Sequence, residues 1–472
     1  MKNFSLGCNY WASHAGTAMW TAWRPETVAA DFDRLAAIGV DTLRVFPLWP
    51  DFQPLALLRG GLGHPREYRF GEEPLPETEE GRAGVSAVML DRFGTLADLA
   101  HARGFDLVVG LVTGWMSGRL FVPPALEGRN VLTDPEAVLW QGRFVRLFVR
   151  RFRHHPAVAA WDLGNECNCM ADAGSRAAAA RWTAEIATAI RAEDPSRKVI
   201  SGMHGLLAVP VNDPWTTPSP SSFWTVEDQA EWTDVLTVHP YPLFTPHCDR
   251  DPVDTLRGGL HATAEGVLYA DVGGKPCFAE EVGTLGPSIC SEETAGRYLR
   301  SVLYSLWSHG NRGMLWWCGF DQANLPQAPY DWLALERELG LFREDLTPKP
   351  VAEELRAFAS FLKEAPALPE RLREGVCILT EGQDAWGAAF ASFLLAKQAG
   401  FDLAVQNAGQ PLRDAPVYLL PSLSSPPSRR FSLALMEKVR AGATLYLSLD
   451  NVVLSGVREW LGADIVDRRE RT

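Results

Sequence analysis

The chain has 472 residues, of which 46% are hydrophobic and 22% are charged, a composition that is ordinary for a globular protein. It excludes the collagen-like, low-complexity and intrinsically disordered classes of protein. No apolar run reaches about 18 residues, so we expect no transmembrane helix and no membrane partner. The formal net charge of −13 argues against nucleic acid as the main partner.

The opening segment MKNFSLGCNYW lacks a basic region followed by an apolar run, so we expect no secretory signal. Eight cysteines are present, and none of them forms a CxxC pair. Reduced thiols and a cytoplasmic location are therefore expected. Cys167 and Cys169 have no partner pair for a metal site, and we expect neither a metal nor a cofactor.

Eight apolar segments of strand length recur in the first 363 residues. These segments are 5–11, 42–49, 105–114, 158–166, 198–204, 235–241, 276–283 and 313–320. Helical patterns follow most of them, at 25–38, 89–103, 135–154, 175–193, 292–309 and 351–363. After the fifth and sixth segments the helical pattern is weakest. Eight β/α units predict an α/β fold, a (β/α)8 TIM barrel over residues 1–363.

The connections differ in length between the two ends of the predicted barrel. Helix-to-strand connections such as IGVD and RGFD are short, whereas the strand-to-helix connections 50–88, 205–225 and 321–350 are long. Such an asymmetry puts the elaborated face at the carboxyl ends of the strands, where barrel active sites lie. The long connections carry Trp215, Trp224 and Trp332, which are candidates for lining a substrate cleft. A doubly wound open sheet is the alternative fold, but it does not need eight regular units.

The pattern restarts after a proline-rich and charged stretch. Residues 364–374 are the predicted linker, and residues 375–472 alternate again between strand and helix patterns. This alternation predicts a second, small parallel α/β domain. No glycine-rich phosphate loop occurs there, so no nucleotide is expected.

Carboxylates follow two of the predicted barrel strands. The fourth strand ends in WDLGNE, at Glu166, and the seventh contains Glu280 and Glu281 in FAEEVG. In a barrel these strands lie on opposite sides of the mouth, so two glutamates there can face each other across a substrate. Glycoside hydrolysis requires such a pair, one protonated carboxyl that donates to the leaving oxygen and one carboxylate that attacks or activates water. If the second carboxylate attacks, configuration is retained and the pair lies roughly 5 Å apart.

Polar residues near these strand ends suit supporting roles. His239 and Tyr241, in TVHPY, share one side of the sixth strand and can orient the attacking carboxylate. Arg44, in TLRVF on the second strand, needs a carboxylate partner if it is buried and would keep that partner ionised. Asn165 can bond a sugar hydroxyl, and Trp317 offers an apolar floor for a sugar ring.

The segment RFRHHPAVAAWDLGNE resembles the acid/base region of the retaining (β/α)8 glycosidases. With the other motifs in order, the chain over about residues 5–363 resembles glycoside hydrolase family 5; these motifs are Arg44, Asn165–Glu166, the run 239–241, the run 281–283 and Trp317. The resemblance implies that Glu166 is the acid/base and Glu281 the nucleophile. It also implies that Asn165 contacts the hydroxyl next to the anomeric centre and that Tyr241 touches the nucleophile.

Two positions depart from the family pattern. The histidine that commonly ends the third strand is absent from VVGLVTGW, and Trp115 or Thr113 is the candidate replacement. The residue before the nucleophile is usually small, whereas here it is Glu280. The register with Gly283 favours Glu281, and Glu280 remains the alternative.

More narrowly, GCNYW and RVFPLWPDFQP resemble the intracellular branch that acts on β-mannosides, including exo-acting β-mannosidases. The second domain resembles the flavodoxin-like trimerisation domain of some β-galactosidases, which implies a homo-oligomer and suggests a trimer. These resemblances imply a retaining exo-β-mannosidase that acts on small β-linked oligosaccharides. The alternatives are an endo-β-1,4-mannanase, a β-galactosidase or β-glucosidase, a non-catalytic sugar-binding barrel, and a metal-dependent hydrolase for which only His204 and His239 are placed to act as ligands.

Overall fold

The structure is a computed structural model that describes residues 4–210, 223–450 and 452–467. The chain divides into two compact units, a larger one that ends at Pro369 and a smaller one formed mainly by Glu370–Thr472. No helix within the described ranges combines the length and the apolar character that crossing a bilayer requires.

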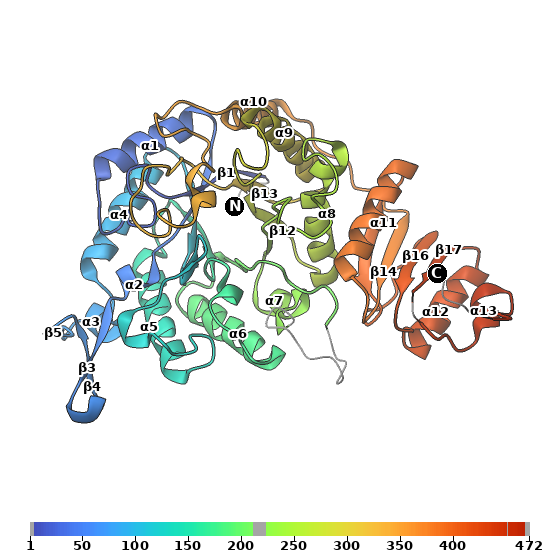
Figure 1. Cartoon of the computed structure of the whole chain (residues 1–472), viewed down its shortest axis with the longest axis horizontal. Coiled ribbons are helices and arrows are strands. Elements are labelled where there is room, and N and C mark those ends of the chain that lie inside the picture. The colour runs from blue at the N-terminus through green and yellow to red at the C-terminus, as the bar shows by residue number, and fades with distance from the viewer. Residues whose placement is uncertain (1–3, 211–222, 451, 468–472) are drawn as a thin grey trace. The chain divides into compact units, whose positions relative to one another are not determined.

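Eight parallel strands form the centre of the larger unit (Figure 1). They are β1 (Ser5–Tyr10), β2 (Thr42–Val45), β6 (Asp106–Gly110), β9 (Val158–Asp162), β10 (Lys198–Ile200), β11 (Leu236–Val238), β12 (Cys277–Val282) and β13 (Gly313–Trp316). Their order in the sheet is β10-β9-β6-β2-β1-β13-β12-β11. A parallel bridge between Ile200 and Val235 joins the two ends of this order and closes the ring. The predicted (β/α)8 barrel is confirmed, and each strand lies within a predicted segment.

The strands are shorter than the apolar segments that predicted them. β2 ends at Val45 and β13 at Trp316, although the apolar pattern continues to residues 49 and 320. These additional residues are buried under the loops of the barrel mouth, and Trp317 still donates its backbone N–H to the carbonyl of Val282, at 2.9 Å. The apolar pattern therefore indicates which residues are buried, and burial continues beyond the residues that pair in the sheet.

Helices surround the barrel (Figure 1). They are α1 (Pro25–Ala37), α4 (Ala87–His101), α5 (Pro135–Phe152), α6 (Arg176–Glu193), α7 (Val226–Trp232), α8 (Leu256–Gly273), α9 (Glu292–Ser308) and α10 (Pro350–Glu364). The helical pattern was weakest at α7 and α8. α8 is buried without interruption from Gly258 to Leu268, so it has no polar stripe to produce a helical period.

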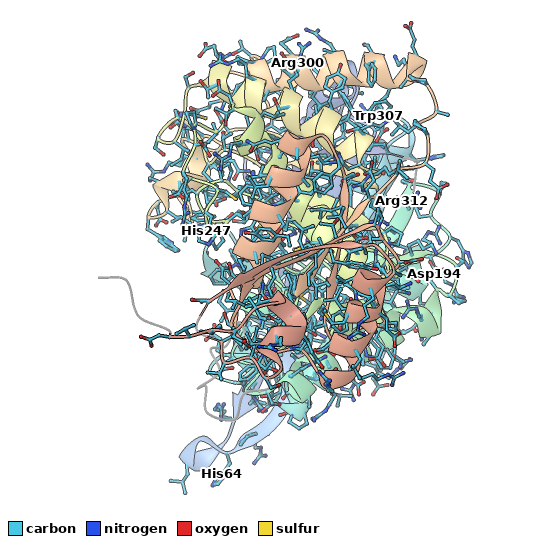
Figure 2. All side chains as sticks on the ribbon, turned by 90° about the vertical axis from the view of Figure 1, so that its right-hand side faces the viewer. His64, Asp194, His247, Arg300, Trp307 and Arg312 are labelled. Carbon is cyan, nitrogen blue, oxygen red and sulfur yellow. The ribbon has the colours of Figure 1, made fainter. Side chains whose placement is uncertain are left out.

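The long second βα connection is not an irregular loop. It contains α2 (Trp49–Phe52), an antiparallel sheet of β3 (Leu55–Arg59), β4 (Pro65–Phe70) and β5 (Glu73–Pro74), and α3 (Glu79–Ala83). The β3–β4 hairpin extends away from the barrel, with His64 near its tip (Figure 2). The third connection contains a smaller hairpin, β7 (Trp115–Met116) and β8 (Arg119–Leu120).

The smaller unit contains a four-stranded parallel sheet. Its strands are β14 (Gly375–Leu379), β15 (Leu403–Asn407), β16 (Val417–Leu423) and β17 (Thr444–Leu449), and its helices are α11 (Ala385–Ala399), α12 (Arg429–Arg440) and α13 (Val457–Leu461). The strand order β15-β14-β16-β17 is second, first, third, fourth along the chain, which is the order of the first four strands in flavodoxin-like sheets. The predicted small parallel α/β fold is confirmed.

One apolar layer fills the lower interior of the barrel. It consists of Val108, Ala160, Ile200, Val235, Phe278 and Leu315, all of them buried. At this level the barrel is thus a packed core and not a channel.

Candidate active site

Arg44 is the centre of the polar side chains at the barrel mouth. Its guanidinium is fully buried and lies 2.8 Å from Oδ2 of Asp162, 2.8 Å from Oε1 of Glu281 and 3.3 Å from Oε1 of Glu280. Nη1 also donates to Oδ1 of Asn165, at 3.0 Å. A buried guanidinium is costly without partners, and these carboxylates supply them. They come from more than one strand, so Arg44 fixes the positions of the acidic residues relative to one another.

A β-bulge places both Glu280 and Glu281 against Arg44. The pairing of β12 with β13 shifts register between Ala279 and Val282. Ala279 pairs with Met314 and Val282 with Trp316, so β12 has one residue more than β13 over this stretch. In a regular strand, adjacent side chains point to opposite faces. The bulge removes that alternation, as bulges beside active sites commonly do. Nothing in the sequence around Glu280 and Glu281 indicates this bulge.

The two glutamates differ in what they contact. The Glu280 side chain is fully buried, and neither of its carboxylate oxygens has a hydrogen-bond partner among the described residues. Glu281 accepts a hydrogen bond from the hydroxyl of Tyr241, at 2.8 Å, and its side chain keeps 6% exposure. Glu281 therefore lies nearer the open mouth, where a substrate would arrive.

Glu166 follows β9 after a tight turn. Its φ is +44°, in the left-handed region, and its N–H donates to the carbonyl of Gly202, at 2.8 Å. A Cβ on Gly164 would lie 2.1 Å from the carbonyl oxygen of Val112, so only glycine fits there. Strained backbone of this kind persists where the surroundings over-determine it, often at functional sites. The turn directs the Glu166 side chain towards β11 and β12.

His239 joins the two glutamates across the mouth. Its Nδ1 lies 2.8 Å from Oε1 of Glu166 and 3.5 Å from Oε2 of Glu281. The sum of these distances limits the separation of Oε1 of Glu166 and Oε2 of Glu281 to about 6 Å, so the two carboxylates lie close together, near the roughly 5–5.5 Å between the carboxyl groups of retaining glycosidases.

The charges in the mouth shift its titrating groups. Burial raises the pKa of Glu166, but the electrostatic effect of His204 and the hydrogen bond and charge of His239 outweigh it and lower this pKa to about 2. Burial lowers the pKa of His239, but Glu281 and Glu166 outweigh it and raise this pKa to about 10. At neutral pH the free site therefore holds a proton on His239, within hydrogen-bond reach of Glu166.

Two more carboxyl groups are affected by burial. Burial and the charge of Glu280 raise the pKa of Asp162 to about 8 against the opposing effect of Arg44. Burial, followed by the charge of Glu166, raises the pKa of Glu281, while His239 and Arg44 oppose the rise. Burial of several acidic groups around few cations thus makes the mouth retain protons.

This retention predicts a pH dependence of stability. The pKa of His239 is about 10 in the folded chain, against 6.5 for an unperturbed histidine, so its contribution is fully present below about pH 6.5 and is lost as pH rises towards 10. The free energy of unfolding should fall over this range, by at most about 1.4 kcal/mol per unit of pKa difference. Urea denaturation at about pH 6 and about pH 10 measures the fall.

The matched control uses a histidine far from the mouth. His239→Asn should reduce the difference in stability between the two pH values, whereas His64→Asn, in the β3–β4 hairpin, should leave it as in the wild type (Figure 2). A His239→Asn chain with the full wild-type difference would contradict this account.

The remaining predicted site residues lie around the same mouth. Asn165 accepts from Arg44 and donates through Nδ2 to the carbonyl of Trp115, at 3.0 Å. Trp317 packs edge-on to Phe46, with ring centroids 6.2 Å apart, and is nearly buried. All eight predicted site residues thus belong to strand ends or loops at the mouth. Trp115 contacts Asn165 through its backbone carbonyl.

Several residues of the mouth carried no sequence signal. Asn9 of β1 donates to the backbone carbonyl of Glu280, at 2.9 Å. Glu336, in a short 3₁₀ turn (Ala334–Arg337) of the last βα loop, accepts hydrogen bonds from Ser117 and Trp317. These contacts join segments that are more than 200 residues apart in some cases, so local patterns cannot reveal them.

The tryptophans of the long loops have different environments. Trp224 is buried and packs against Trp182, with ring centroids 6.1 Å apart, so it belongs to the core. Trp332 is 57% exposed. Trp215 lies outside the described residues.

One set of side chains has the residue types of a metal site. Glu166, His204 and His239 each offer one ligand atom, and these atoms lie within 4.8 Å of one another. Oε1 of Glu166 is already hydrogen-bonded to His239, and His204 Nδ1 lies 3.8 Å from it. Two histidines and one carboxylate are chemically suited to zinc. The same three groups can equally serve proton transfer.

No protein-family model matches the chain. Among curated proteins, mannan endo-1,4-β-mannosidase F of Aspergillus fumigatus is 27% identical over 215 residues, covering 44% of this chain and 47% of the relative. Mannan endo-1,4-β-mannosidase A of Podospora anserina is 27% identical over 210 residues, covering 41% and 51%. The chain spans about half the length of the curated relatives it matches.

Solved structures match over more of the chain. The exo-β-1,4-mannosidase Op5Man5 from Opitutaceae bacterium strain TAV5 has a TM-score of 0.78 at 24% identity, covering 99% of this chain and 81% of that one. The GH5_18 protein from Streptomyces cattleya, in complex with GlcNAc, has a TM-score of 0.71 at 22% identity, covering 86% and 94%. At these identities the likeness shows a shared fold. The names of the curated relatives and the fold shared with these structures agree with the resemblance of the chain's motifs to glycoside hydrolase family 5.

Proposed function

We propose that the chain is a retaining, exo-acting β-glycosidase whose first substrates are short β-mannosides. Glu281 is the nucleophile and Glu166 the acid/base. The observation that carries the proposal is the pair of distances from His239 Nδ1 to the two glutamates, 2.8 and 3.5 Å. They favour direct attack by a carboxylate, because two carboxylates this close together are typical of retaining glycosidases, whereas inverting ones leave room for a water molecule.

In the first step, Glu281 attacks the anomeric carbon and the bond to the leaving oxygen breaks. Arg44 and Tyr241, each 2.8 Å from a Glu281 oxygen, favour its ionised form and fix its orientation. Glu166 gives a proton to the leaving oxygen. We infer that this proton comes from Nδ1 of His239, which lies 2.8 Å from Glu166.

In the second step, water hydrolyses the glycosyl ester on Glu281. Glu166 takes a proton from the attacking water and passes it to Nδ1 of His239, so the site returns to its starting state with His239 protonated and Glu166 ionised. Attack from the side opposite to the first displacement restores the original configuration. No metal or cofactor takes part in either step as proposed.

The choice of mannose is supported by the names of the relatives and neighbours. The curated relatives are named mannan endo-1,4-β-mannosidases, and a structural neighbour that covers 99% of this chain is named an exo-β-1,4-mannosidase. The curated names favour an endo-acting mannanase as the second candidate. A β-galactosidase or β-glucosidase is a third, and one structural neighbour is a β-galactosidase from Marinomonas.

The test is the anomer formed first. We expect the wild type to hydrolyse an aryl β-mannoside, with the β-hemiacetal appearing first by proton NMR. Product analysis on mannan oligosaccharides should show mannose alone as the early product. Rates should be equal with and without a chelator. An α-first product would exclude double displacement, early release of larger oligosaccharides would favour an endo-acting mannanase, and inactivation by chelator would favour a metal-dependent hydrolase.

We further propose that the smaller unit serves homo-oligomerisation, with a trimer as the first expectation. Its sheet ends at β17, where Tyr446 is 54% and Leu449 39% exposed. Exposed strand edges with apolar side chains favour association between chains. Native mass spectrometry of the full chain tests this, and a monomer at micromolar concentration would contradict it.

A further inference from the structure

Glu336 is an acidic side chain that the proposed double displacement does not use. It belongs to the last βα loop, between β13 and α10. Its Oε2 accepts hydrogen bonds from the hydroxyl of Ser117, at 2.8 Å, and from Nε1 of Trp317, at 3.3 Å. Its Oε1 accepts none from any residue that the structure describes. One oxygen is therefore anchored and the other is free to accept a new bond.

Glu336 lies within reach of the charges of the two proposed catalytic glutamates. The charges of Glu281 and Glu166 both act on Glu336, and burial with these charges raises its pKa to about 7. Glu336 in turn acts on Tyr241, the partner of Glu281. No arginine or lysine among the described residues forms an ion pair with it. A third carboxylate here is unfavourable by itself, and a glutamine would accept the same two anchoring bonds.

Contacts between loops hold Glu336 in place. The β7–β8 hairpin meets the last loop through the bond from Ser117 and through Arg119, whose Nη1 donates to the carbonyl of Ala328 at 3.2 Å. A Cβ on Gly118 would lie 2.8 Å from the side chain of Leu333, so hairpin and loop are closely packed. The last loop also contacts the first βα loop, because the hydroxyl of Tyr330 accepts the N–H of Thr17, at 3.1 Å. Three loops thus close together on one side of the mouth.

We propose that Glu336 is a specificity-determining residue that recognises the glycone, the sugar at the non-reducing end, by accepting a hydrogen bond from one of its ring hydroxyls. The inference rests on the proposed glycosidase function and deepens it. Trp317, which the sequence predicted to lie against the sugar ring, donates its indole N–H to Glu336. The three loops close one side of the mouth and include Glu336, which can accept a hydrogen bond from a sugar hydroxyl. This arrangement suits a terminal sugar, because no further sugar unit is attached to it on the closed side.

Glu336→Gln is the matched test, because glutamine keeps the shape and can keep both anchoring bonds while it replaces the free acceptor with a donor. Glu338→Gln is the control, an exposed glutamate two residues along the same loop. Wild type and both variants are assayed on an aryl β-glycoside that the wild type hydrolyses and on its 2-, 3-, 4- and 6-deoxy analogues. Thermal unfolding of each variant establishes that it is folded.

We expect Glu336→Gln to lower kcat/KM by about 10- to 100-fold on the complete sugar, the range for a hydrogen bond to a charged group. Glu338→Gln should match the wild type. On one deoxy analogue the loss caused by Glu336→Gln should largely disappear, because the hydroxyl that Glu336 binds is missing. That analogue identifies the hydroxyl.

Two results would overturn the inference. Equal kcat/KM for Glu336→Gln and Glu338→Gln would mean that Glu336 contacts no substrate. The same loss on the complete sugar and on every deoxy analogue would mean that Glu336 acts through the charges of the mouth instead. A wild type that hydrolyses no β-glycoside would instead contradict the proposed function, so the two failures are distinguishable.

Discussion

Glu281→Gln should lower kcat/KM on an aryl β-mannoside by at least about 10³-fold, or roughly 4 kcal/mol of transition-state stabilisation. Glutamine has no anionic oxygen and cannot form the glycosyl ester. Its amide oxygen can accept from Arg44 while its amide N–H donates to the hydroxyl oxygen of Tyr241, so the variant should fold with a melting temperature near that of the wild type. Steady-state kinetics and thermal unfolding measure the two effects.

The direct readout is the site of covalent attachment. A 2-deoxy-2-fluoro β-glycoside with a good leaving group should accumulate as an ester, and peptide mass spectrometry should find it on Glu281. Glu280→Gln is the comparison, because Glu280 is the adjacent carboxylate beside Arg44. An ester on Glu280, or full activity in the Glu281 variant, would transfer the role of nucleophile to Glu280.

Glu166→Ala should lower kcat/KM on oligosaccharides by about 10³-fold, because their sugar leaving groups need a proton. The loss should be much smaller for the first step with a dinitrophenyl leaving group, which departs without protonation. Azide should then accelerate the second step, since it attacks the ester without general base catalysis. The β-glycosyl azide should appear as product, detectable by NMR.

Cys169→Ser is the control for this experiment. Cys169 is exposed and lies in the 3₁₀ turn (Cys167–Cys169) that follows Glu166, so its replacement should leave all rates unchanged. Losses for Glu166→Ala that are equal for good and poor leaving groups, with no response to azide, would exclude a role as acid/base and leave Glu166 as a positioning residue.

The number and order of the barrel strands followed from local sequence. Each strand is a short apolar run, and alternation with helical segments along one chain permits few arrangements other than a barrel. The ends of the strands were less predictable, as Trp317 shows, because apolar residues under the mouth loops resemble strand residues in one dimension. α8 was unclear for a related reason, since a helix buried on nearly all sides has no period.

The sequence by itself determined the barrel, the second parallel domain and the strand ends at which Glu166 and Glu281 stand, because these depend on patterns within about ten neighbouring residues. Only the tertiary structure decided how those side chains meet. The bulge that turns both Glu280 and Glu281 towards Arg44 arises from pairing between β12 and β13. The bond between Ser117 and Glu336 joins loops 219 residues apart. Such contacts are made by the closing of the barrel, which brings distant strand ends to one mouth, and no local pattern records them.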